Sequence, residues 1–174
     1  TLTVDADGDG IDSNGDLTVN GGTIIVNGPT NDGNGALDSG AESGGTISVN
    51  GGTIIALGSS GMAEGFDTNS KQYSFLYNFS SAVSAGTEIS ITDASGNVIY
   101  SYTTTKDCYS IEFSSSQLKE GAVYTITAGT QTATVTMSAI AVNSSSTMNA
   151  GGGMQRGTAG TANNTTTTTT AKTA

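Results

Sequence analysis

Near the start of the chain, five carboxylates lie within twelve residues and are separated by small residues. They are Asp5, Asp7, Asp9, Asp12 and Asp16. Charges this close repel one another unless a cation lies among them, and carboxylate, amide and carbonyl oxygens are the ligands that a hard divalent ion takes. The stretch therefore predicts a calcium site.

The spacing within this stretch, Asp-x-Asp-x-Asp-Gly with an acid at the twelfth position, matches the loop of an EF-hand. The flanking residues do not match, because 1–4 and 17–19 alternate at period two and are rich in β-branched side chains. We therefore expect strands, not helices, on both sides of the loop. Calcium there would either stiffen this end of the fold or also contact a ligand.

Composition indicates an all-β protein of one domain or two small ones. The 174 residues include 25 glycines and many Ser and Thr, and no window has the spacing of an amphipathic helix. No apolar run is long enough to span a membrane, so membrane insertion is not expected. The chain starts at Thr1 without a leader, so we expect that a signal peptide or a further part of the protein precedes it.

The net charge of -10 is concentrated in the first part of the chain. Residues 1–70 contain ten acids and no Lys or Arg, whereas 71–174 contain five of each sign. Nucleic acid is not an expected partner, because phosphate binding requires a basic face. Cys108 is the single cysteine and the chain has no His, so neither a disulfide framework nor cysteine catalysis is expected.

A repeat organises the first sixty residues. The segment 17–28 recurs at 47–58, with eight of twelve positions identical. This period and the strand composition predict stacked coils of a parallel β-helix, each with two short strands that meet at a Gly-Gly corner. We expect inward-facing residues to stack in pairs and Asn20 to lie over Asn50. The expected pairs are Leu17 with Ile47, Val19 with Val49, Ile24 with Ile54 and Val26 with Ala56.

A second correspondence links the repeat to the acidic stretch. Ile11-Asp12-Ser13 matches Leu37-Asp38-Ser39, so Asp12 and Asp38 are expected to be neighbours in successive coils. Two carboxylates in that arrangement repel unless they are protonated or bridged by a cation. The repeat thus adds Asp38 to the predicted metal ligands, and Asp32 could extend the site.

Three parts of the chain follow from these patterns. Residues 1–65 are expected to be the C-terminal coils of a longer β-helix. Residues 66–142 carry six predicted strands at the spacing of a small antiparallel sandwich-like module that would cap the coils. Residues 143–174 are rich in Ser, Gly and Thr and predict a disordered tail.

Four motifs in this order resemble the last part of a bacterial family of secreted carbohydrate-binding proteins. The motifs are Gly8-Asp-Gly-Ile-Asp-Ser-Asn-Gly15, the repeated Val-Asn-Gly-Gly-Thr-Ile-Ile, Gly33-Asn-Gly-Ala-Leu-Asp38 and Gly58-Ser-Ser-Gly-Met-Ala63. The family's clostridial type member is a right-handed parallel β-helix that binds calcium and polygalacturonate. The resemblance implies an extracellular protein, secreted or on the cell surface, that contains calcium and binds acidic glycan.

Three functions remain open from the sequence. The first is a non-catalytic, calcium-dependent binder of acidic polysaccharide, in which the ion is shared with sugar carboxylates. The second is a structural or adhesive cell-surface segment that calcium only stabilises. The third is a lyase or hydrolase, which the lack of any Lys or Arg before Lys71 disfavours, because a lyase needs a base near its calcium.

Overall fold

The computed structural model describes residues 1–144 as an all-β chain. In that range there is no α-helix, and the one helical segment is a short 3-10 turn at Ala41–Ser43. None of these residues forms a helix of the length and apolarity that crossing a membrane requires. Of the tail expected over 143–174, all but the first two residues lie outside the described range.

The N-terminal strands pair in parallel in three small sets. The strands are β1 (Leu2–Asp5), β2 (Ile11–Asp12), β3 (Leu17–Val19), β4 (Thr23–Asn27), β5 (Leu37–Asp38), β6 (Ile47–Val49) and β7 (Thr53–Gly58). β4 lies between β1 and β7, β2 pairs with β5, and β3 pairs with β6. Each segment of the first repeat therefore lies beside its counterpart in the second.

The register confirms the predicted stacking residue by residue. Leu17 is the partner of Ile47, and Val19 of Val49. In the same way Ile24 is the partner of Ile54 and Val26 of Ala56. The amide ladder at the corner is also present, because Asn50 Nδ2 donates a hydrogen bond of 2.8 Å to Asn20 Oδ1.

The side chains that stack also form the core of this part. Val26, Val49, Ile54 and Ala56 are fully buried, and they belong to a cluster that also contains Leu17, Val19, Ala36, Leu37, Ile47 and Phe66. The corner after Asn50 requires glycine, since Gly52 has a φ of 100° and a Cβ there would lie 2.6 Å from the carbonyl oxygen of Gly22. The repeat is thus fixed by burial on one side and by corner geometry on the other.

The C-terminal strands follow the predicted positions closely. They are β8 (Ser74–Val83), β9 (Glu88–Thr92), β10 (Val98–Thr103), β11 (Cys108–Ser114), β12 (Val123–Ala128), β13 (Gln131–Thr136) and β14 (Ala141–Asn143). The first six were expected from their alternating pattern. β14 was not, and it ends at Asn143, inside the expected tail.

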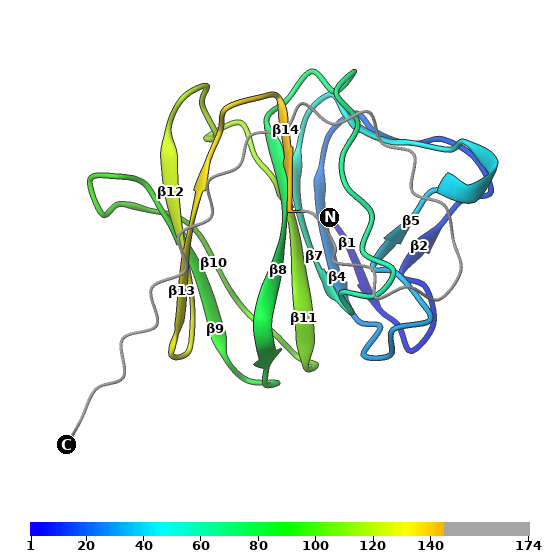
Figure 1. Ribbon diagram of the computed structural model, residues 1–174, viewed down its shortest axis with the longest axis horizontal. Coiled ribbons are helices and arrows are strands. Elements are labelled where there is room, and N and C mark those ends of the chain that lie inside the picture. Colours follow the sequence, from blue (N-terminus) through cyan, green and yellow to red (C-terminus); the bar gives the residue numbers. More distant parts are fainter. Residues whose placement is uncertain (145–174) are drawn as a thin grey trace.

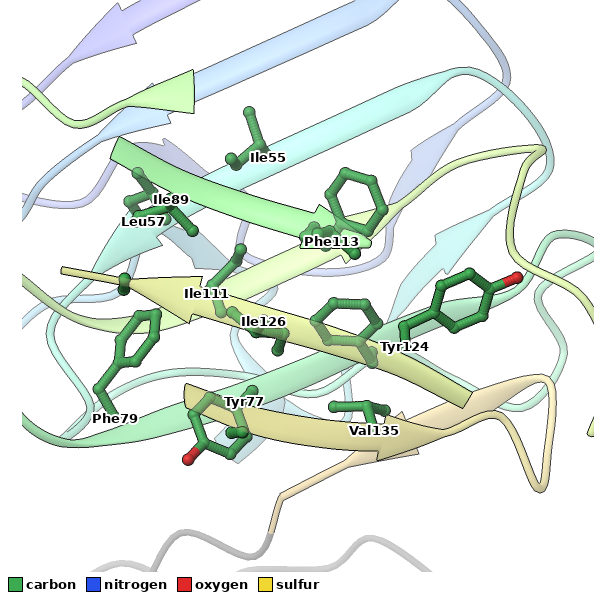
Figure 2. Packing of buried hydrophobic residues seen from close by; sticks show 14 of the residues in the cluster. Ile55, Leu57, Tyr77, Phe79, Ile89, Ile111, Phe113, Tyr124, Ile126 and Val135 are labelled. Atoms are coloured by element: carbon green, nitrogen blue, oxygen red, sulfur yellow. The ribbon is translucent and has the colours of Figure 1, made fainter. Parts of the chain in front are cut away.

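Two larger sheets pack face to face (Figure 1). One has six strands in the order β1-β4-β7-β11-β8-β14, and the other has four in the order β10-β9-β12-β13. Between them lies the second core cluster, which includes Ile111, Phe113 and Ile126 (Figure 2). The two sheets form a sandwich, but not within the expected module alone, because one sheet also contains β1, β4 and β7 of the N-terminal part.

The link between the two parts is a shared sheet. β11 pairs antiparallel with β7, so the edge of the last N-terminal strand is hydrogen-bonded and not left open. The segment 59–72 runs beside β6. Phe66 forms an isolated parallel β-bridge with Ile47, and the amide of Lys71 donates a hydrogen bond of 2.8 Å to the Val49 carbonyl.

Candidate metal centre

The first two acids of the predicted site contact a lysine from the far part of the chain. Lys106, in the loop between β10 and β11, places Nζ 2.7 Å from Asp5 Oδ1 and 2.8 Å from Asp7 Oδ1. The same ammonium donates to the carbonyl oxygen of Ala6 at 2.8 Å. Three oxygens of the acidic stretch thus surround one cation, which this chain itself supplies.

This contact shifts both kinds of group toward their charged forms. Hydrogen bonding and charge attraction from Lys106 hold the pKa of Asp7 below its ordinary value. The two carboxylates in turn raise the pKa of Lys106 above its ordinary value. All three groups are solvent-accessible, so the ion pairs are expected to weaken with salt.

Two further predicted ligands accept hydrogen bonds from the neighbouring repeat. Asp9 Oδ1 accepts from the Gly35 amide at 2.8 Å. Asp16 Oδ1 accepts from the amide of Thr46 at 3.1 Å and from its hydroxyl at 2.9 Å. These carboxylates therefore join the first layer of the N-terminal part to the second.

The remaining two acids form the predicted pair. Asp12 lies opposite Asp38 in the parallel register of β2 and β5, and adjacent strands are about 4.8 Å apart. Leu37, which precedes Asp38, is buried, and Ile11, which precedes Asp12, packs against the same core. The alternation of a strand therefore turns Asp12 and Asp38 outward. Asp38 Oδ1 accepts from the Gly40 amide at 2.9 Å, and Asp12 is exposed. Like charges directly opposite each other on neighbouring strands are destabilising.

The six predicted ligands are not gathered around one point. Within residues 1–144, no group of three or more Asp, Glu or Cys side chains is close enough to hold a metal ion. The EF-hand spacing does not wrap a single centre here, because the chain between Asp5 and Asp16 runs past one strand end, through β2 and into a turn before β3. A calcium ion at Asp12 and Asp38 remains a prediction.

Sequence reasoning missed the basic partner and a buried acid. Lys106 lies 99 residues from Asp7 along the chain, and no local pattern links them. Glu112 in β11 is fully buried, and within residues 1–144 neither of its carboxylate oxygens has a hydrogen-bond partner. The sequence does contain an indication of this acid, since Glu112 lies between the apolar strand residues Ile111 and Phe113.

The tyrosines of the module do not form an open stacking platform. Tyr77 and Tyr124 belong to the core, and Tyr73, Tyr100 and Tyr102 pack against it. Among the tyrosines of residues 1–144, Tyr109 is the exposed one. Cys108 is buried, and its burial raises the pKa of the thiol to about 12.

No protein-family model, curated protein or solved structure matches this chain.

Proposed function

We propose that the protein is a non-catalytic, calcium-dependent binder of acidic polysaccharide such as polygalacturonate, acting outside the cell. In this proposal a calcium ion binds at the outward-facing carboxylates of Asp12 and Asp38 and is shared with carboxylates of the sugar chain. The ion reverses the local sign of the surface, so that an anionic glycan is attracted to an acidic face.

The single observation that carries the proposal is the register of Asp12 and Asp38. The two carboxylates are stacked across adjacent strands, and neither forms an ion pair with a basic side chain of residues 1–144. Asp5 and Asp7 are neutralised by Lys106 instead. A divalent cation is a ligand that would remove the repulsion of the Asp12 and Asp38 pair.

The fold that we propose for residues 1–65 is the last part of a right-handed parallel β-helix. Three parallel pairings in consecutive order along the repeat, β1 with β4, β2 with β5 and β3 with β6, support it. A further parallel pairing, of β4 with β7, carries the stack onward. A β-helix presents a flat, repetitive side, which suits a long repetitive polymer.

Retention on insoluble polygalacturonate tests the proposal. The chain is incubated with the polymer in calcium or in excess chelator, with a neutral glucan and a fully methyl-esterified pectin as controls. Retention that requires both calcium and free uronate carboxylates is the expected result. Equal retention with and without chelator, or equal retention on the neutral polymers, would contradict calcium bridging.

A structural role is the second candidate, and one observation favours it. Asp9 and Asp16 both accept hydrogen bonds from the next layer, at Gly35 and Thr46. Acids used in this way hold the stack together without any ligand. A stabilising calcium ion with no glycan retention would support this second candidate, a structural or adhesive cell-surface segment.

A further inference from the structure

A fully buried acid, Glu112, lies where β11 meets the segment 59–72, which carries the partly buried Glu64. Glu112 is in the middle of β11, between Ala56 of β7 and Leu76 of β8 in the sheet register. Its neighbours Ile111 and Phe113 face the sandwich core, so Glu112 points to the opposite face. Burial raises the pKa of Glu112 well above its ordinary value, the negative charge of Glu64 raises it further, and the Glu64 backbone amide offsets part of the rise.

The surroundings of Glu112 offer no neutralising group. Its side chain is fully buried, and both carboxylate oxygens lack a hydrogen-bond partner. No Lys or Arg of residues 1–144 contributes to its charge environment, whereas Glu64 adds repulsion. An isolated buried carboxylate costs several kcal/mol unless it is paired, protonated or bound to a metal.

A proton alone fits this position poorly. The Glu64 backbone amide acts as a donor toward Glu112 and favours its charged form. A protonated carboxyl also needs an acceptor for its O–H, and the described protein places none within hydrogen-bond distance. Two more buried oxygens without partners, Ser74 Oγ and Asn78 Oδ1, lie on the adjacent strand at the positions that flank Leu76. The unpartnered oxygens therefore collect on one face of the sheet.

Other oxygens near this face of the sheet are held in place by hydrogen bonds. Glu64 Oε2 accepts hydrogen bonds from the amide and the hydroxyl of Ser39. The hydroxyl of Ser110, two residues before Glu112 on the same face, donates to the carbonyl oxygen of Ser59 at 2.8 Å. Carboxylate, hydroxyl and carbonyl oxygens together are the ligand set of a hard divalent cation.

We propose that Glu112 and Glu64 bind a divalent cation, of the calcium class, at the junction between the N-terminal strands and the C-terminal module. The ion would neutralise both carboxylates and give the two Glu112 oxygens a ligand. It would also fasten the segment 59–72, which carries Glu64, onto β11. This site is buried and is distinct from the exposed carboxylates of Asp12 and Asp38, so it contributes to stability and not to glycan contact.

Thermal melting with and without calcium tests this proposal, in the background D12N/D38N so that the surface pair does not contribute. A bound ion is expected to raise the melting temperature by about 5 °C or more at saturating calcium over chelator. E112Q should lose that rise and melt higher than its parent in chelator, because a neutral amide removes the buried charge. E64Q, at a less buried position, should also lose the rise and keeps the test valid if E112Q does not fold.

The outcomes separate this site from the proposed function. No calcium-dependent rise in the D12N/D38N parent, or an equal rise in both glutamine variants, would overturn the buried cation site. Retention of E112Q and E64Q on polygalacturonate should stay at the wild-type level, because their carboxylates are not on the glycan face. Loss of retention in D12N/D38N with the calcium-dependent melting rise intact is the result that both proposals expect.

Discussion

Asp12 lies directly opposite Asp38 in the parallel register of β2 and β5. The two strands are equivalent segments of successive coils, and each carries a carboxylate at the same position. The repeated sequence creates this repulsion by the same stacking that buries Leu37 beneath it. A cation bound between the two carboxylates would offset their repulsion and take their oxygens as ligands. We therefore place the proposed ion at this pair and not at the whole acidic stretch.

Lys106 and Asp7 define a pH-dependent contribution to stability. Because the Asp7 pKa is lowered on folding, its contribution is present above the ordinary value of about 4 and is lost as pH falls through the lower folded value. Because the Lys106 pKa is raised, its contribution is present below about 10 and is lost as pH rises through the higher folded value. Lys106→Met should therefore destabilise the protein most between these limits.

Urea unfolding of Lys106→Met across this pH range measures the effect, and the same variant should approach wild-type stability in high salt. Lys71→Met is the matched control, because Lys71 is exposed and forms no ion pair with residues 1–144. A loss of stability in Lys106→Met that is equal at all pH values would show that the lysine acts through packing of its stem.

Gly45 tests how closely the two layers approach. A Cβ at this position would overlap the carbonyl oxygen of Ser39 and lie 2.7 Å from that of Gly15. Gly45→Ala should destabilise the protein by about 1–3 kcal/mol, as overpacking does. The control is Gly15→Ala, where a Cβ meets nothing within 4 Å. Equal free energies of unfolding for the two variants would contradict the described contact.

Tyr102 and Asn27 join the two large sheets through a buried amide. Asn27 Nδ2 donates to the Tyr102 hydroxyl at 2.8 Å, and the hydroxyl lies 3.1 Å from Asn27 Oδ1. Asn27 is 2% exposed, and its Oδ1 also accepts from the Thr105 amide at 3.4 Å. Tyr102→Phe leaves the buried Nδ2 without its acceptor and should cost about 1–3 kcal/mol. Chemical denaturation measures the loss, with Tyr109→Phe at an exposed tyrosine as control. A change of a few tenths of a kcal/mol in both variants would contradict the role assigned to the hydroxyl.

Cys108 should be unreactive while the protein is folded. Burial raises the pKa of its thiol to about 12, so at pH 8 the thiolate that reacts with alkylating agents is almost absent. We expect iodoacetamide to label the thiol at the rate of global unfolding and not of the free amino acid. Mass spectrometry at increasing urea concentrations measures this, and rapid labelling in native buffer would contradict the described burial.

Much of the fold follows from local pattern. Alternation located the strands from β8 to β13. The repeat located the register of Leu17 with Ile47, because equivalent positions of a repeat are buried in the same way in successive coils. β14 was not predicted, because three residues show too little periodicity. Its position is fixed by Asn143, whose side chain forms two hydrogen bonds with the backbone of Phe66.

The candidate site was harder to predict, for a physical reason. The EF-hand spacing brings its ligands together when the loop curls between helices, whereas here extended chain at about 3.3 Å per residue carries successive acids to different partners. Asp7 contacts Lys106, and Asp16 contacts Thr46. Those contacts depend on tertiary structure and leave no mark in the local sequence. Asp12 and Asp38 could be paired because the repeat itself encodes their register.

A calcium titration by calorimetry most directly tests whether Asp12 and Asp38 bind an ion. The wild-type chain is compared with D12N/D38N and with D5N/D7N. The second variant also removes two negative charges, but from the carboxylates that contact Lys106. We predict that D12N/D38N loses one calcium-binding event and that D5N/D7N retains it. Identical isotherms for the wild type and D12N/D38N would contradict a cation at this pair.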